Sequence, residues 1–150
     1  MKRFTCAAAS LSFAVAVAAR VLLAQNPTAI AVVKDPGCGC CTKWVQHLSK
    51  AGFKATVTES STINALKDSK GVPKAARSCH TATVGGYVIE GHVPADVIKR
   101  LLIERPNVVG LAVPGMPAGS PGMEVGGRTD PYDVLAFDKA GKTSVFASRR

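Results

Sequence analysis

Three cysteines within four positions constrain the fold of this chain more than any other feature. Cys38, Cys40 and Cys41 lie in the stretch DPGCGCC. A β-branched run at 28–34 precedes them and predicts a buried strand, and apolar residues recur at helical spacing over 42–51. A C-x-x-C pair beside a βαβ unit is typical of a redox motif, and Cys38 and Cys41 form such a pair. The stretch therefore predicts an α/β chain whose cysteines lie where its first helix begins.

The elements expected further along the chain favour the same class of fold. They are a strand at 54–59, a short helix at 61–73, a hairpin at 81–93 that turns on Gly85-Gly86, and a helix between Pro94 and Pro106. Strand, cysteine turn, helix, strand, helix, hairpin and helix follow one another in the order of a thioredoxin-like fold. We therefore predict an α/β thioredoxin-like fold with a central mixed sheet flanked by helices.

Two segments follow these elements. Residues 110–127 hold six glycines and three prolines, and this composition predicts a loop rather than a regular element. Long loops inside compact domains are often functional. Residues 132–147 then predict a C-terminal hairpin that turns near 139–142. A length of 150 residues is typical of one domain.

The N-terminus predicts export. Met1-Lys2-Arg3 is basic, and an uncharged run of 16 small and apolar residues follows at 4–19, as in a secretory signal peptide. This run is shorter than the roughly 20 residues that span a bilayer, so we expect no membrane insertion after processing. We predict a signal peptide at 1–24, cleaved between 18 and 24, and a thioredoxin-like metal-binding domain at 25–150. Cys6 is then lost, and the mature chain works in an oxidising compartment.

The charge distribution argues against nucleic-acid binding. The formal net charge of +9 falls to +6 once Lys2, Arg3 and Arg20 are removed. The excess is spread along the chain, with no run of five or six basic residues, and is typical of a solvated surface. Aromatic residues are only 5% of the chain, too few to favour stacking on bases.

The cysteines have the chemistry of soft-metal ligands. Unpaired N–H groups and the helix dipole lower the pKa of a thiol at a helix N-terminus, so Cys40 and Cys41 are expected to form thiolates. Thiolates select Cu(I), Zn(II) and iron–sulfur clusters over hard ions. A closed zinc site usually takes a second C-x-x-C pair, which is absent. Adjacent cysteines suit bridging between ions, and the arrangement therefore favours Cu(I), as one ion or several.

A fourth sulfur follows from the predicted topology. Cys79 and His80 begin the third strand, and in thioredoxin-like folds the loop before that strand packs against the C-x-x-C turn. Cys79 and His80 are therefore expected beside the three cysteines. The alternative is a structural disulfide from Cys79 to one of the three. We expect Trp44 to pack in the core and His47 to lie on the surface, while the role of His92 stays open.

The two methionines of the mature chain, Met116 and Met123, both lie in the loop at 110–127. Neither follows a helical or strand period, as a core methionine normally does. Thioethers are soft, neutral ligands that suit Cu(I). We predict that both are metal ligands. The alternative is that they cover apolar surface beside the sheet.

Four motifs in order resemble one known family. The segments CGCCTKW, SCHTA, YVIEGHVPADVI and VPGMPAGSPGME are similar to those of the CopG-like periplasmic copper-resistance proteins, a family once catalogued as a domain of unknown function. The resemblance covers about residues 28–135. It implies a thioredoxin-like fold, the periplasm of a Gram-negative bacterium and a role in copper homeostasis. It also implies copper bound by Cys38, Cys40, Cys41 and Cys79, with redox cycling of thiols and metal.

We therefore predict a periplasmic copper-binding protein of copper resistance. Its partners are copper ions and other periplasmic copper-handling proteins, and its expected ligands are Cys38, Cys40, Cys41, Cys79, His80, Met116 and Met123. The main alternative is a periplasmic thiol–disulfide oxidoreductase with Cys38 or Cys41 as nucleophile, so enzymatic activity stays open. The third cysteine and the methionines favour copper, since simple disulfide exchange needs neither. A zinc-stabilised binding module is a third alternative.

Overall fold

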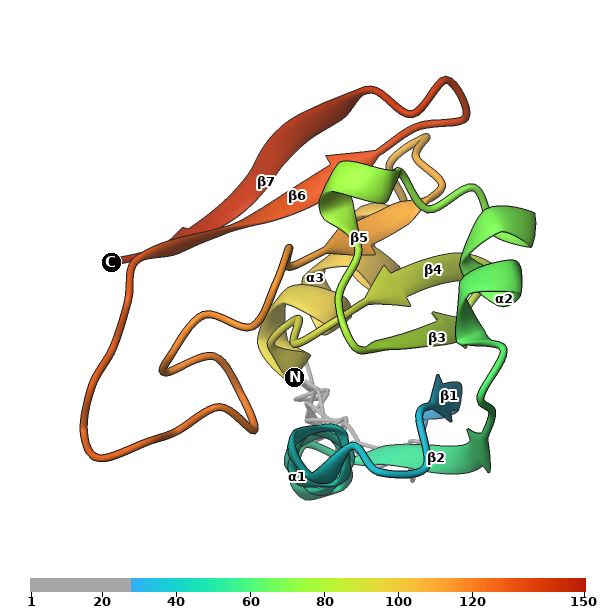
Figure 1. The fold of residues 1–150 in the computed structure, drawn as a ribbon. Helices are drawn as coiled ribbons and strands as arrows, with labels where there is room; N and C mark the ends of the chain where they lie inside the picture. The colour runs from blue at the N-terminus through green and yellow to red at the C-terminus, as the bar shows by residue number, and fades with distance from the viewer. Residues whose placement is uncertain (1–27) are drawn as a thin grey trace, which may run out of the picture.

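The computed structural model describes residues 28–150, which form one seven-stranded mixed sheet with helices on both faces (Figure 1). The signal peptide predicted at 1–24 lies outside these residues. The elements are β1 (Thr28–Lys34), α1 (Gly39–Lys50), β2 (Phe53–Glu59), α2 (Ile63–Ser69), the 3₁₀ turn η1 (Lys74–Ala76), β3 (His80–Val84), β4 (Tyr87–Glu90), α3 (Ala95–Glu104), β5 (Gly110–Ala112), β6 (Tyr132–Phe137) and β7 (Thr143–Arg149).

The strands lie in the order β2-β1-β3-β4-β5-β6-β7. The pairs β1–β2 and β4–β5 are parallel, and the other neighbours are antiparallel. The α/β class with a central mixed sheet flanked by helices is therefore confirmed. The elements from β1 to α3 follow the predicted order, which is compatible with a thioredoxin-like arrangement, and β5, β6 and β7 extend the sheet beyond it.

Each face of the sheet has its own apolar core. Helices α1 and α3 cover the face with the larger cluster, to which they contribute Trp44, Leu48, Val97, Ile98 and Leu101. The other face, beside α2 and η1, carries a smaller cluster formed by Val72, Ala76, Val88, Ala112 and Phe137. Because side chains alternate along a strand, Ile89 joins the first cluster and Val88 the second. No helix within residues 28–150 has the length and apolar character needed to cross a bilayer.

Strand β5 corrects one prediction, since residues 110–127 were expected to contain no regular element. Residues 110–112 pair with both β4 and β6 and are fully buried. A side chain at Gly110 would place its Cβ 1.9 Å from the carbonyl oxygen of Val88, so glycine permits the close backbone approach. The neighbouring strands supply the hydrogen bonds of β5, and a composition rule cannot detect a strand formed in this way.

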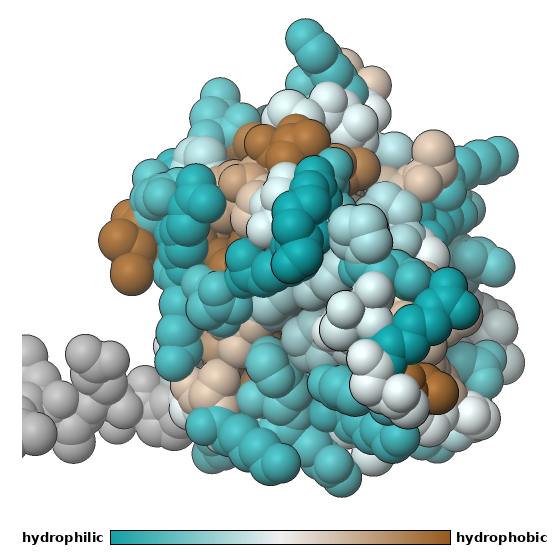
Figure 2. Space-filling model, turned by 90° about the vertical axis from the view of Figure 1, so that its left-hand side faces the viewer, coloured by the Kyte–Doolittle hydropathy of each residue, from teal (hydrophilic) through white to brown (hydrophobic). Residues whose placement is uncertain are grey.

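Residues 113–131, called here the covering loop, connect β5 to the C-terminal hairpin of β6 and β7 (Figure 1, orange). The hairpin agrees with its prediction and turns between Phe137 and Thr143. Figure 2 views the molecule from the left-hand side of Figure 1, and that face is mostly hydrophilic with scattered hydrophobic side chains. Met116 and Val125 of the covering loop are among the exposed apolar residues of the protein.

Candidate metal centre

Helix α1 begins at Gly39, among the cysteines as predicted, and three residues before the apolar period recognised over 42–51. Cys38 is the N-cap residue, and its Sγ accepts a hydrogen bond from the backbone N–H of Cys41 at 3.3 Å. Cys41, Trp44 and Leu48 follow at helical spacing and are fully buried. These anchors fix the first turn of α1 on the sheet. Cys38 and Cys40 are only partly covered and stay accessible at its end.

A disulfide joins Cys38 to Cys41, whose Cα atoms are 5.4 Å apart. Cys40 and Cys79 are free. The alternative in which Cys79 pairs with one of the three cysteines is therefore wrong for this structure, because the oxidised partners lie within the C-x-x-C motif itself. The expectation of a thiolate at Cys41 does not apply to this oxidised form either, since its sulfur is already bonded.

Cys79 lies against the cysteine turn, at the entrance to β3. Its Sγ is 4.0 Å from the Sγ of Cys40, which is in turn 3.4 Å from the Sγ of Cys38. The Sγ of Cys41 lies 3.9 Å from the carbonyl oxygen of Cys79. All four Sγ atoms fall within 4.8 Å of one another. The structure thus brings together the four cysteines that the sequence predicted to be neighbours.

Two histidines form a second group of potential ligands with Cys79. The ligand atoms of Cys79, His80 and His92 also lie within 4.8 Å of one another. The Sγ of Cys79 is 3.4 Å from His80 Nδ1 and 3.1 Å from His92 Nε2. Both histidines are fully buried. His80 was predicted to lie at the site, whereas the sequence left the role of His92 open.

The covering loop determines which nitrogen of His92 faces the sulfur. His92 Nδ1 lies 2.8 Å from the carbonyl oxygen of Pro121. A carbonyl can only accept, so Nδ1 carries the proton, and in the neutral ring the lone pair of Nε2 faces Cys79. A partner of this kind also fixes the ring of a metal-binding histidine. His80 differs, because its Nε2 is buried and finds no hydrogen-bond partner among residues 28–150.

Burial disfavours the charged forms of Cys79, His80 and His92. Desolvation, with a smaller effect from the neighbouring Cys40, raises the pKa of the Cys79 thiol to about 11. Desolvation also lowers the pKa of His80 to about 3, and repulsion by His92, when that ring is protonated, and by Lys67 lowers it further. The pKa of His92 is lowered for the same main reason, burial. Neutral imidazoles keep the lone pairs that a metal ion needs.

The covering loop packs directly on the first turns of α1. A Cβ at Gly122 would lie 2.7 Å from the carbonyl oxygen of Cys40 and 2.8 Å from the backbone nitrogen of Trp44. Gly122 also has a φ of +89°, in the left-handed region that favours glycine. The loop backbone therefore touches the cysteine turn where a larger residue would not fit.

The predicted methionine ligands lie in the covering loop, and their coordination stays a prediction. The side chain of Met116 is 51% exposed. Its neighbour Gly115 accepts a hydrogen bond from Ser78 Oγ and donates its N–H to the carbonyl of Arg77 at 3.3 Å. Met116 is therefore next to a residue tethered to the segment that carries Cys79. Met123 is partly buried and bonds through its backbone to Gly119 and Ser120.

Trp44 and His47 of α1 have structural contacts. The indole of Trp44 is buried, as predicted, and donates to the carbonyl of Val93 at 2.9 Å. Its ring packs on that of His80, with centroids 4.2 Å apart. His47 was predicted to lie on the surface, but it is half-buried and its Nε2 accepts the backbone N–H of Ala95 at 3.1 Å. His47 thus caps the start of α3.

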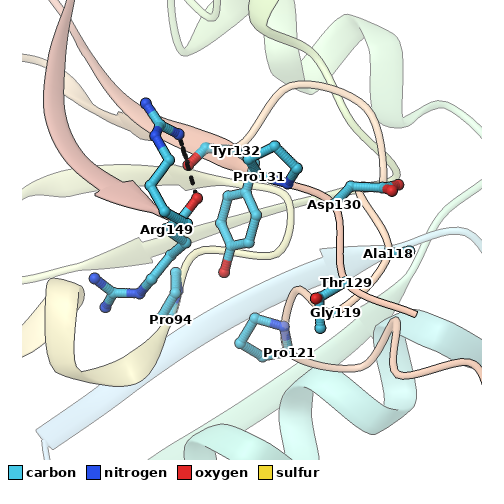
Figure 3. Close-up of a pocket in the computed structure, with 10 residues that line it drawn as sticks. Pro94, Ala118, Gly119, Pro121, Thr129, Asp130, Pro131, Tyr132 and Arg149 are labelled. Atoms are coloured by element: carbon cyan, nitrogen blue, oxygen red, sulfur yellow. Dashed lines mark hydrogen bonds between the residues drawn. The ribbon is translucent and has the colours of Figure 1, made fainter. Parts of the chain in front are cut away.

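A concave pocket of about 620 Å³ lies between the covering loop and the C-terminal hairpin. The Tyr132 ring occupies its centre in Figure 3, with Pro94, Pro121 and Arg149 around it. None of the four cysteines lines this pocket. The sulfur cluster is therefore a separate site on the other side of Pro121, whose carbonyl holds His92.

The chain is similar to known proteins both in sequence and in fold. Residues 76–123 match the family described as "Protein of unknown function, DUF411". Curated protein sequences give no match. The solved structure "Copper resistance protein copG- Form 2" is 48% identical with a TM-score of 0.79, over 83% of this chain and 99% of that chain. "Copper resistance protein copG- Form 1" is 48% identical with a TM-score of 0.78, over 82% and 98%. Because the identity of 48% extends over nearly the whole length of the two solved chains, this chain belongs to the CopG-like copper resistance family.

Proposed function

We propose that this protein binds Cu(I) in the periplasm through its cysteine cluster and contributes in this way to copper resistance. The observation that carries the proposal is the position of four Sγ atoms within 4.8 Å of one another. Sulfur is the donor that Cu(I) prefers among protein ligands. The solved relatives are named copper resistance proteins. The signal peptide predicted at 1–24 supports the periplasmic location.

The spacing of the sulfurs suits soft-metal coordination. Metal–sulfur bonds of about 2.3 Å place two sulfurs on one ion about 4 Å apart. Cys40 and Cys79 are separated by 4.0 Å, and Cys40 also lies 3.4 Å from Cys38. Cys40 therefore occupies a bridging position between its two neighbours. This arrangement supports more than one bound ion.

The histidines and methionines would complete the ligand set. His92 presents a lone pair toward Cys79, and the unpartnered Nε2 of buried His80 is the kind of group that a ligand satisfies. Met116 offers a soft thioether from the covering loop, where its side chain is half exposed. The donors around Cys79 therefore include sulfur and nitrogen, so that copper could be exchanged or change its oxidation state at this site.

The Cys38–Cys41 disulfide makes copper binding dependent on redox state. Addition of two electrons and two protons from an external dithiol converts this disulfide to two thiols. These thiols lose their protons when they bind metal. The reduced protein then offers four sulfurs, whereas the oxidised form offers Cys40 and Cys79. We expect the reduced form to bind more Cu(I), and more tightly.

The test is a Cu(I) titration of the anaerobically reduced mature chain against a competing chelator. We expect Cys79→Ser to weaken binding by at least a hundredfold, because it removes the sulfur shared by both ligand groups. His92→Gln should weaken Cu(I) binding by about tenfold, the lower end of the loss in metal affinity that usually follows removal of a side chain that supports a metal site. His47→Gln is the matched control, since His47 lies on α1 away from the sulfurs. Unchanged affinity in Cys79→Ser would remove the cluster from the function.

A thiol–disulfide oxidoreductase is the second candidate, and the Cys38–Cys41 disulfide is the observation that favours it. Cys38 is partly exposed at the N-terminus of α1, while Cys41 is fully buried. Attack by an external thiolate on the Cys38 sulfur would release Cys41 as the leaving thiol. The check is an insulin-reduction assay. Rates comparable to those of a thioredoxin, together with weak Cu(I) binding, would replace the copper function by this one.

A further inference from the structure

A buried ion pair lies behind the metal centre, on the face of the sheet that α2 covers. Lys67 Nζ of α2 donates to Glu90 Oε1 of β4 at 2.5 Å. The two side chains are 2% and 0% exposed. Lys67 also donates to Thr81 Oγ1 at 2.9 Å, and Thr81 donates to Glu90 Oε2 at 2.6 Å. Both carboxylate oxygens are thus occupied within a closed network.

This network reaches the segment that carries Cys79. Glu90 Oε1 accepts the backbone N–H of Ser78 at 2.7 Å. Ser78 immediately precedes Cys79, and Thr81 immediately follows His80. The carboxylate of Glu90 therefore fixes the residues on both sides of Cys79 and His80.

Close packing leaves the segment little freedom to move. A Cβ at Gly91 would lie 2.5 Å from the Cβ of Ser78 and 2.7 Å from the carbonyl oxygen of Val113. The N–H of Gly91 donates to the carbonyl of His80 at 3.0 Å. Ser78 is therefore held against β4 from one side by Gly91 and through its N–H by Glu90. Movement of Glu90 would release Ser78 and, with it, Cys79.

Stability alone does not explain a buried ion pair at this place. The desolvation of two charges cancels much of their attraction, and a well-packed apolar pair is often as stable. The surroundings would accept apolar residues, because the same face carries the apolar cluster that contains Val72, Ala76 and Val88. An apolar pair could not accept the N–H of Ser78, the contact that joins this network to the residue directly before Cys79.

We propose that Glu90, oriented by Lys67, is a positioning residue that holds Cys79 within reach of the other cysteines. The expected effect of Glu90 on Cu(I) affinity rests on the proposed copper function, but the position of Cys79 is measurable without copper. The essential feature is the Glu90 oxygen that accepts a hydrogen bond from the N–H of Ser78. The ion pair with Lys67 orients this oxygen.

Two double variants separate the acceptor oxygen from the charges. Lys67→Met with Glu90→Leu removes the ion pair and the acceptor, whereas Lys67→Met with Glu90→Gln removes the charges and keeps an acceptor oxygen. Ile98→Val, a core truncation on the other face of the sheet, controls for loss of stability. We expect the Leu variant to bind Cu(I) at least tenfold more weakly than wild type in chelator competition. The Gln variant should stay within about threefold of wild type, and Ile98→Val should not differ from it.

A second measurement needs no copper. With the Cys38–Cys41 disulfide intact, iodoacetamide reacts only with Cys40 and Cys79 among residues 28–150, and mass spectrometry separates the two products. We expect the ratio of Cys79 to Cys40 alkylation to rise several-fold in the Leu variant and to stay near wild type in the Gln variant.

The outcomes distinguish this inference from the proposed function. Wild-type affinity and a wild-type alkylation ratio in a folded Leu variant would overturn the positioning role. If the double variant with Glu90→Leu fails to fold, the double variant with Glu90→Gln still tests the inference. Weak Cu(I) binding by that folded protein would show that an oxygen that accepts the Ser78 N–H is not sufficient to position Cys79. Absence of Cu(I) binding by the wild type would instead overturn the proposed function, and the alkylation ratio would still test the position of Cys79.

Discussion

The cysteine turn and the covering loop meet at the candidate metal centre, but different forces hold them. The turn is fixed by a helix cap, by a disulfide and by the buried side chains of Trp44 and Leu48. The covering loop is held mainly by backbone contacts, namely Pro121 O on His92 and the close approach of Gly122 to α1. The sulfurs of the turn are thus positioned by side-chain packing, whereas the orientation of His92 depends on a loop backbone.

This difference divides the centre into two parts that can be perturbed separately. Changes in the loop should move His92 first, because Pro121 holds its Nδ1. Changes in the turn should alter the sulfur set first. His80 lies between the two, packed on Trp44 and 5.0 Å from His92 between ring centroids. The predictions below test this division, from the largest expected effect to the smallest.

The largest effect should come from pH, through the histidines that join the turn to the loop. Burial lowers the pKa of His80 to about 3, and it also lowers the pKa values of His92 and His47. The unfolded chain takes up these protons near pH 6.5. The stability is therefore fully present above pH 6.5 and is lost as the pH falls toward the folded pKa values. His80 alone should contribute a slope of about 1.4 kcal/mol per pH unit.

Urea unfolding of the metal-free protein between pH 7 and pH 4 measures this slope. His80→Gln should flatten it, whereas Arg100→Gln, a change in the exposed pair with Glu104, should leave it unchanged. A wild-type stability that stays constant over this range would contradict the burial of neutral His80.

Gly122→Ala should break the contact between loop and turn. The new Cβ would meet the backbone of Cys40 and Trp44, and alanine would adopt a φ of +89°. We expect the free energy of unfolding to fall by about 1–3 kcal/mol, the cost typical of a strained backbone, and Cu(I) affinity to fall as His92 moves. Chemical denaturation and chelator competition measure the two effects.

Gly126→Ala is the matched control for this variant. Gly126 also has a positive φ, of +56°, but nothing lies within 4 Å of its Cβ position. Backbone strain is then present without the clash. Equal losses of Cu(I) affinity in both variants would show that the contact with α1 does not position the loop.

The same division explains which parts of the site the sequence could predict. Cys38, Cys40, Cys41 and Cys79 lie at the ends of elements with clear apolar periods, so their meeting followed from the expected topology. His92 could not be assigned, because its role depends on a carbonyl 29 residues away in the covering loop. Neither Glu90 nor Lys67 was predicted to belong to the site, because only the pairing of β3 with β4 and the docking of α2 bring them together.

The disulfide should have a smaller effect on stability. Cys38 and Cys41 are separated by only 3 positions, so the bond closes a very short loop and removes little entropy from the unfolded chain. We expect reduction to lower the free energy of unfolding by about 2 kcal/mol or less. Denaturation with and without reductant measures this difference, and Cys38→Ser with Cys41→Ser should show it without reductant. A loss above about 4 kcal/mol would mean that the disulfide, rather than the buried anchors, fixes the turn.

Met116→Leu should have the smallest effect on folding. Its side chain is half exposed, and leucine keeps similar size and apolarity, so the free energy of unfolding should change by less than about 0.5 kcal/mol. If the thioether is a ligand, Cu(I) affinity should nevertheless fall by several-fold, because leucine offers no donor.

Met123→Leu tests the second predicted ligand in the same way, and Val125→Leu is a matched exposed control in the covering loop. Wild-type affinity in both methionine variants would assign copper binding to the cysteines and histidines. The covering loop would then contribute to the site through its backbone, by the Pro121 carbonyl on His92 and the packing of Gly122 on α1.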